Sequence, residues 1–259
     1  MTENTQRFTG RVLEYAQYRE RYEPEIVLPI LRDLCGLDAG WIVADIGAGT
    51  GMVGDLFRAN GNRIFAIEPN EEMRAACIRL HLADSQFSVL DGSAENTGLA
   101  DASVDMIAIG RALHWFNIDA ALPEFHRILK PGGWVAILAC GRREDGRAEN
   151  VAFKALLNDI TGRDNRPEKL RKVYERMAGF FPGGEFHHAE ADGEMCLNWD
   201  QLRGLTLSIS HAPLPGAPNF DAFESALRSF FDQHAKQDRI TFAARTWVSV
   251  GRFSRVAAP

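Results

Sequence analysis

Residues 43–51, VADIGAGTG, join an apolar run to a loop in which Gly47, Gly49 and Gly51 alternate with Ala48 and Thr50. The apolar run predicts a buried strand. Glycine takes left-handed backbone turns without strain and brings bare main-chain groups against a ligand. The sequence therefore predicts a binding loop for a dinucleotide, a phosphate group or the adenosyl group of S-adenosylmethionine.

The glycines alone do not choose among these ligands, because Gly49, Gly51 and Gly54 also fit the G-x-G-x-x-G pattern of nicotinamide and flavin enzymes. Asp45, at the end of the strand, favours a cationic ligand, since a carboxylate there would repel a pyrophosphate. S-adenosylmethionine carries an ammonium and a sulfonium and no phosphate. A P-loop is excluded, because no Gly-Lys-Ser or Gly-Lys-Thr follows.

A second acid, Glu68, ends the next predicted strand, residues 63–68, and Pro69 follows it. At this place in a dinucleotide-type fold a carboxylate binds ribose, and its two acceptor oxygens match a diol. We therefore predict that Glu68 binds both ribose hydroxyls. The alternative is an acid that only caps the following helix, residues 70–80.

The third predicted strand and the turn after it occupy residues 87–95. Small residues in that turn leave room for a flat ring, so we predict that Asp91, Ser93 and Ala94 contact the edge and face of the adenine. The alternative is an ordinary turn in which Asp91 or Ser93 caps the backbone.

A fourth strand is predicted for residues 103–110. Ligands of open α/β sheets lie beyond the carboxyl ends of the strands. Gly110 and Arg111 are therefore predicted to lie beside the cofactor, with His114 a few residues further along.

Five segments resemble, in this order, the motifs of class I S-adenosylmethionine-dependent methyltransferases: residues 45–51, Glu68, 91–95, 112–116 and 128–133. The chain is most similar to the small-molecule branch related to trans-aconitate and ubiquinone/menaquinone-biosynthesis methyltransferases. The resemblance covers residues 8–138 well and the rest loosely. It implies a Rossmann-like, doubly wound α/β fold with a seven-stranded sheet of order 3-2-1-4-5-7-6. Strand 7 would be antiparallel, and S-adenosylmethionine would lie over strands 1, 2 and 4.

The remaining apolar runs fit that expectation. Further strands are predicted at 133–140, 186–197 and 239–253, and crossover helices at 51–60, 70–82 and 118–129. We predict a single domain over 1–259. It comprises an N-terminal helical arm (1–40), a cofactor-binding core (41–140), and a remainder (141–259) that supplies the last strands and inserts forming a lid.

Residues 8–34, 141–184 and 198–237 lie outside the cofactor scaffold and are expected to build the acceptor pocket. Family members often begin with a Tyr-Arg-Pro pattern, and here Glu20 replaces the proline. Tyr15 and Arg19 are spaced to share one helical face, so Arg19 is predicted to meet the methionyl carboxylate of the cofactor. The alternative is that Arg19 pairs with a surface glutamate.

The methyl group of a sulfonium is already activated, so the enzyme mainly positions the acceptor and removes its water. His114 is the candidate general base, because a histidine titrates near neutral pH. Substrate orientation, or packing in the pocket wall beside Trp115 and Phe116, is an equal alternative for His114. His211 is a weaker second candidate for the base.

Two other functions stay open. Gly49, Gly51, Gly54 and Glu68 also allow an NAD(P)-dependent oxidoreductase, although Asp45 does not predict one. The second of these functions is that of a non-catalytic S-adenosylmethionine-binding subunit that serves a partner protein.

The composition of the chain narrows the classes of molecule that it is expected to bind. The chain has 259 residues, 46% of them hydrophobic, and a formal net charge of −6, which argues against nucleic acid. Basic residues within 163–176 alternate with acids, as on a solvated helix face. The polar start and the lack of an apolar run near ~18 residues predict a cytoplasmic protein without a membrane segment, a monomer or homodimer. The four cysteines lack metal-ligand spacing, so reduced thiols and no metal are expected.

Overall fold

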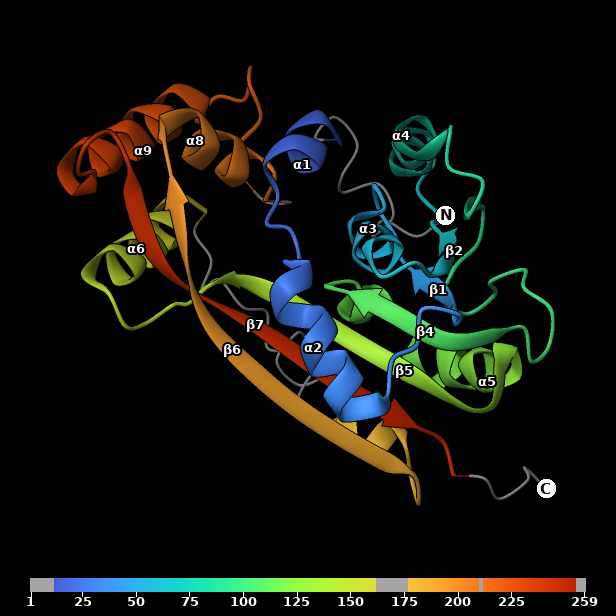
Figure 1. Cartoon of the computed structure of the whole chain (residues 1–259). Helices are drawn as coiled ribbons and strands as arrows, with labels where there is room; N and C mark the ends of the chain where they lie inside the picture. Colours follow the sequence, from blue (N-terminus) through green and yellow to red (C-terminus); the bar gives the residue numbers. More distant parts are fainter. Residues whose placement is uncertain (1–11, 162–176, 210–211, 255–259) are drawn as a thin grey trace.

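The computed structural model describes residues 12–161, 177–209 and 212–254, and its centre is a seven-stranded sheet (Figure 1). The strands follow the order β3-β2-β1-β4-β5-β7-β6, and β7 runs antiparallel to both of its neighbours. The predicted order and the antiparallel seventh strand are therefore confirmed. The strands are β1 Ile42–Ile46, β2 Arg63–Ile67, β3 Phe87–Leu90, β4 Val104–Gly110, β5 Leu129–Arg142, β6 Glu185–Leu197 and β7 Ile240–Arg252.

Helices cover both faces of the sheet. The described helices are α1 Val12–Tyr18, α2 Pro24–Cys35, α3 Met52–Ala59, α4 Glu71–His81, η2 Leu113–Trp115, α5 Ile118–Ile128, α6 Ala148–Thr161, η3 Met177–Phe180, α8 Trp199–Leu207 and α9 Phe220–His234. The predicted crossover helices correspond to α3, α4 and α5. None of the helices within the described ranges is long and apolar enough to cross a membrane.

Successive residues of each central strand enter opposite cores, as the pleat of a strand requires. Val43 and Met106 pack into the cluster that includes residues of α2 and α3. Ala44 and Ile107 pack into the cluster that includes residues of α5. In Figure 1, α2 and α5 accordingly lie on opposite sides of the sheet.

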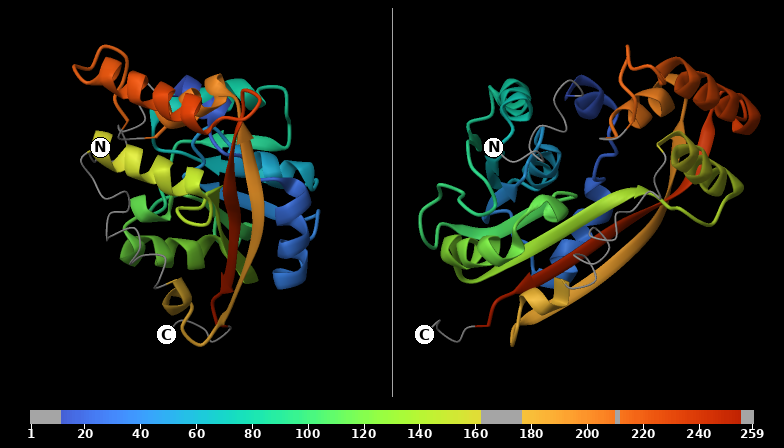
Figure 2. Two further views of the ribbon diagram at one scale, coloured as in Figure 1. Left: turned by 90° about the vertical axis from the view of Figure 1, so that its left-hand side faces the viewer. Right: turned by 180° about the vertical axis from the view of Figure 1, so that it is seen from behind.

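A third core lies away from these two, where β6 and β7 extend past the shorter strands (Figure 2). It joins residues of α6, α8 and α9 to the first part of β7, with Phe153, Phe230 and Phe242 among its buried rings. We call α6, α8, α9 and the strand ends that they cover the cap. The cap consists mainly of segments that the sequence predicted as inserts.

Local sequence signals explain several helix ends. Gly51, with a φ of 94°, stands at the N-cap of α3. The side chain of Asn70 accepts a hydrogen bond from the Met73 N–H at the start of α4. Asn198 and Gln201 form a reciprocal capping box at the start of α8.

One predicted strand was wrong in extent. The fifth strand starts at Leu129 rather than 133 and ends at Arg142 rather than 140. Leu129 already pairs with Val104, and a register shift before Met106 absorbs the Pro-Gly-Gly stretch that was expected to precede the strand. The N-terminal segment, residues 8–34, was expected to help build the acceptor pocket. Its helix α2 packs against the sheet, because Val27, Leu28 and Leu31 are buried in the core, and the contribution of this segment to the pocket stays a prediction.

Other expectations concern smaller features. All four cysteines are free thiols, but Cys196 is exposed, unlike the core thiols expected. His211 and the basic residues of 163–176 lie outside the described residues.

Candidate functional site

The loop of residues 47–51, which we call the glycine loop, connects β1 to α3, and its three glycines have positive φ values of 70°, 59° and 94°. A Cβ at Gly47 would lie 2.7 Å from the Ala112 Cβ, and one at Gly51 would lie 2.6 Å from the His81 ring. A Cβ at Gly49 would lie 3.9 Å from the nearest atom, which belongs to the Tyr15 ring. Gly47 and Gly51 are thus needed for packing, whereas the space around Gly49 is less crowded and its positive φ is what favours glycine there.

Two further glycines are explained by packing. A Cβ at Gly54 would lie 2.5 Å from the Phe87 ring, so its absence lets α3 approach the sheet closely. A Cβ at Gly110 would lie 2.2 Å from Val53 and 2.9 Å from the Tyr22 hydroxyl. Gly110 was predicted as a cofactor contact, and its surroundings supply a structural reason for the glycine. Its contact with a cofactor stays a prediction.

Glu68 ties the end of β2 to the glycine loop. The backbone N–H of Gly49 donates to Glu68 Oε2 at 2.8 Å, and that of Asn70 donates to Glu68 Oε1 at 2.8 Å. Burial raises the pKa of Glu68 above its ordinary value, and these two N–H groups only partly offset that effect. Asn70, two residues on and separated from Glu68 by Pro69, is the residue that caps α4. A carboxylate offers about four lone pairs, so Glu68 keeps acceptor capacity for a ligand.

Asp45 is completely buried at the end of β1. Its Oδ2 accepts a hydrogen bond from the Gly54 N–H at 3.0 Å, and its Oδ1 has no hydrogen-bond partner among the described residues. Burial raises the pKa of Asp45 to about 7, while the Gly54 N–H opposes that rise and the charge of Glu68 adds to it. An unpartnered carboxylate oxygen in this place is consistent with attraction to a cation.

The turn after β3 lies beside the end of β2, because Leu90 pairs with Ile67. Asp91 is exposed, and its Oδ1 lies 3.2 Å from Arg74 NH1. Ser93 and Asn96 exchange backbone hydrogen bonds of 2.9 and 3.3 Å, and the side chain of Ala94 is buried. The structure thus places these residues just beyond the carboxyl end of β3, beside the end of β2. Their contact with adenine stays a prediction.

The helix α1 lies over the strand ends, between the glycine loop and the cap (Figures 1 and 2). The Arg19 guanidinium lies 5.6 Å from the Tyr15 ring centroid, which confirms that these two residues share one face. Arg19 Nε lies 3.3 Å from Glu20 Oε2. Arg19 therefore pairs with a glutamate, as the alternative prediction stated, although Glu20 is largely buried rather than on the surface.

Arg111 joins the same cluster from the end of β4. Its two terminal nitrogens donate to Glu20, one to Oε2 at 2.9 Å and the other to the backbone carbonyl at 2.8 Å. Burial raises the pKa of Glu20, but the charges of Arg19 and Arg111 outweigh burial and hold that pKa below its ordinary value. Arg111 also has a φ of 55°, an unusual conformation for a residue with a side chain.

His114 lies in η2, directly after β4. Its ring centroid is 4.5 Å from that of Trp115, in a tilted arrangement. The next residue, Phe116, lies 3.3 Å from the position that a Gly47 Cβ would take. The segment after β4 therefore packs against the glycine loop, which places His114 near it. Whether His114 acts as a base stays a prediction.

The sequence did not identify the role of Glu20. It marked Glu20 only as a departure from a family pattern, whereas the structure makes it the shared partner of Arg19 and Arg111. An acid beside an arginine in an otherwise apolar arm was the available signal. Nor did the sequence single out Arg142, a charged residue directly after the apolar part of β5.

Known proteins share these features. A methyltransferase domain family matches residues 44–137, from β1 into β5. An uncharacterized methyltransferase of Schizosaccharomyces pombe is 30% identical over 69% of this chain and 67% of its own length. An uncharacterized methyltransferase of Mycobacterium bovis is 32% identical over 63% of this chain, and the match spans 62% of that relative's length.

A solved structure from Anaeromyxobacter dehalogenans, a proposed type II methyltransferase, has the same fold. The two structures align with a TM-score of 0.65 over 93% of this chain and 100% of the other, at 21% identity. The sequence relatives show that the chain belongs to the methyltransferase family, and the solved structure shows the shared fold. The cofactor of that family is S-adenosylmethionine.

Proposed function

We propose that this protein transfers a methyl group from S-adenosylmethionine to a small-molecule acceptor by in-line displacement. The observation that carries the proposal is the junction of Glu68 with the glycine loop. There a carboxylate with spare acceptor capacity accepts a hydrogen bond from the Gly49 N–H, at the least crowded glycine of the loop. That pair fits a ligand that presents a ribose diol beside a positively charged group.

Each part of the cofactor has residues that would hold it. Glu68 would bind the ribose hydroxyls, and Asp91, Ser93 and Ala94 would surround the adenine. Arg19 would meet the methionyl carboxylate, in exchange for part of its contact with Glu20. Bound S-adenosylmethionine supplies a methyl group that its sulfonium already activates.

The protein's own contribution is to place the acceptor and keep water away. The helix α1 covers the strand ends, with Tyr15 over Gly49 and Tyr18 packed against α8 at Gly204. Such cover supports a small acceptor over a macromolecular one, as does the net charge of −6. If the acceptor carries a proton, His114 would accept it.

Titration calorimetry tests the cofactor. We expect wild-type protein to bind S-adenosylhomocysteine and to give no heat with NAD. Binding of NAD without S-adenosylhomocysteine would support the oxidoreductase instead. Turnover is then measured as S-adenosylhomocysteine formed from S-adenosylmethionine with a panel of phenols, quinols, amines and carboxylic acids. Cofactor binding without turnover on any of these acceptors would favour the non-catalytic subunit.

The role of His114 is tested by His114→Gln. If His114 is the base, its removal should lower kcat and leave the affinity for S-adenosylhomocysteine unchanged. A pH profile of kcat that loses its acidic limb in the variant would support this role. An unchanged profile would place His114 in the pocket wall.

A further inference from the structure

Arg142, the last residue of β5, lacks the partners that a largely enclosed guanidinium normally has. It packs on two rings of the cap, with its guanidinium carbon 4.4 Å from the Phe153 centroid and 5.8 Å from the Phe242 centroid. Its Nε is buried without a hydrogen-bond partner among the described residues. Its terminal nitrogens also have no acceptor among those residues, and they are not among the fully buried atoms. The end of the side chain therefore stays accessible.

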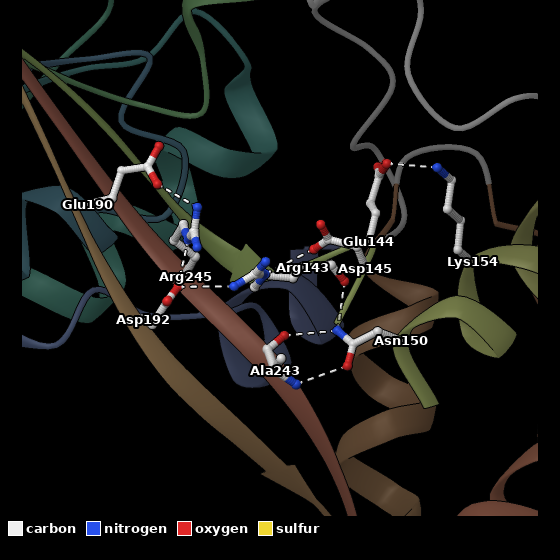
Figure 3. A network of polar contacts seen from close by, with 9 residues as sticks. All are labelled: Arg143, Glu144, Asp145, Asn150, Lys154, Glu190, Asp192, Ala243 and Arg245. Carbon is white, nitrogen blue, oxygen red and sulfur yellow. Dashed lines mark hydrogen bonds and ion pairs between the residues drawn. The ribbon is translucent and has the colours of Figure 1, made fainter. Parts of the chain in front are cut away.

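The next residue shows the contrast, because successive side chains of a strand point to opposite faces. Arg143 is fully partnered in the network of Figure 3. Its Nε donates to Asp145 at 2.9 Å and its NH1 to Asp192 at 3.4 Å. Two consecutive arginines thus differ: Arg143, directly after β5, is paired with carboxylates, and Arg142, the last residue of β5, is not.

The two acids whose charges act on Arg142, Glu20 and Glu144, already have other partners. Glu20 is shared by Arg19 and Arg111, and Glu144 accepts a hydrogen bond from Lys154 Nζ at 2.9 Å. Glu20 is therefore paired with two arginines, at positions 19 and 111, and the charge of Arg142 acts on the same carboxylate. S-adenosylmethionine cannot balance this excess, because its amino-acid group is zwitterionic and its sulfonium adds one more positive charge.

The ring against which Arg142 packs is held firmly. The helix α6 is fixed by Asn150, whose amide donates to the Arg143 carbonyl at 2.7 Å and to the Ala243 carbonyl at 2.9 Å. Asn150 Oδ1 also accepts from the Ala243 N–H at 2.9 Å (Figure 3). Phe153 follows on the next turn of α6. The guanidinium is thus preorganised by packing rather than by hydrogen bonds to acceptors.

We propose that Arg142 binds a carboxylate group of the methyl acceptor, so that the substrate class is a small carboxylic acid. This rests on the proposed function. A planar guanidinium binds a carboxylate through two parallel N–H bonds, and such bonds are stronger where water is restricted. The rings beside Arg142 provide an apolar surface for the body of the acid.

The test uses protein saturated with S-adenosylhomocysteine and two matched pairs of probes: benzoate with benzamide, and hexanoate with hexanamide. We expect at least one acid to raise the melting temperature and its amide to leave it unchanged. Arg142→Gln should abolish this difference, and Arg143→Gln, the matched control on the same strand end, should retain it. Arg142→Lys keeps the positive charge but loses the two parallel N–H groups of the guanidinium, so it should weaken binding of the acid at least 5-fold.

Several outcomes would overturn the inference. They are equal stabilisation by acid and amide, no stabilisation by either acid, and an unchanged difference in a folded Arg142→Gln or Arg142→Lys variant. Stabilisation by phenyl phosphate but not by benzoate would also exclude a carboxylate. A titration with S-adenosylhomocysteine alone separates two further cases. Failure of wild type to bind it overturns the proposed function, whereas weakened binding only in Arg142→Gln would show that Arg142 serves the cofactor.

Discussion

The strands that carry the glycine loop and its neighbours, β1 to β4, are four to seven residues long, whereas β5, β6 and β7 have thirteen or fourteen residues. The helices α3 and α4 directly follow β1 and β2 in the chain, and η2 and α5 follow β4. The long strands reach the cap, whose core joins Phe153 of α6 to Phe242 of β7. The cofactor half is therefore assembled from neighbouring segments, and the cap from distant ones.

The two regions also differ in the charges that they bury. Asp45 and Glu68 are buried acids beside the glycine loop, and burial raises the pKa of both. Around Glu20, by contrast, the charges of three arginines, Arg19, Arg111 and Arg142, act on one carboxylate and hold its pKa low. Buried acids suit a cationic group, and an excess of half-buried arginines suits an anionic group, so the two regions are complementary to opposite charges.

The largest expected effect concerns Asp45. Burial raises its pKa to about 7 in the folded protein, well above the ordinary value of about 3.9, so folding favours the protonated form. Its contribution therefore lowers the free energy of unfolding as pH rises from about 4 to about 7, by on the order of 4 kcal/mol. Asp45→Asn should remove this decline, and urea unfolding at pH 5 and pH 8 measures it. Asp101→Asn, at an exposed position, is the control, and equal pH dependence in wild type and Asp45→Asn would contradict the prediction.

Glu68→Ala should weaken binding of S-adenosylhomocysteine by about 3 kcal/mol, or roughly 100-fold, because two charge-assisted hydrogen bonds to ribose are lost. Calorimetry measures the affinity. Glu71→Ala, a nearby exposed acid at the start of α4, should bind as wild type does. Equal affinities in the two variants would show that the acid at the end of β2 does not bind the ribose.

Gly204→Ala tests the contact between α1 and the cap. The new Cβ would lie 2.1 Å from the Tyr18 ring, so α1 must shift away from α8. We expect a loss of about 2 kcal/mol in the free energy of unfolding and faster hydrogen exchange in α1. Gly193→Ala on β6 has no atom within 4 Å of its new Cβ and should change neither quantity. Equal behaviour of the two variants would mean that α1 does not depend on this contact.

The smallest effect is expected at Arg245, which pairs with Glu190 and Asp192 on the outer face of the long strands (Figure 3). These carboxylates are largely solvated, so their attraction is weak and is screened by salt. Arg245→Ala should leave the midpoint of urea unfolding within error of wild type in 0.15 M salt. A clear fall in that midpoint would show that the surface network stabilises the long strands more than screened ion pairs do.

The sequence predicted the cofactor half well, because its signals are local. The glycine loop, the strand endings at Glu68 and near Asp91, and the helices between them depend on residues close in the chain. The same reasoning placed the start of β5 wrongly, since that start depends on pairing between Leu129 and Val104. For Gly110, the neighbours Val53 and Tyr22 explain why a glycine is needed, and its contact with the cofactor stays a prediction.

By itself, the sequence determined the order of the elements and the chemistry of the loop, because hydrophobic periodicity and glycine act over a few residues. Only the tertiary structure decided which charges meet. Glu20 and Arg111 lie 91 residues apart in the chain and form an ion pair, and Arg142 adjoins that cluster without a carboxylate of its own. Pairing between charges depends on distance in space and on the water excluded around them, and neither can be read from positions along a chain.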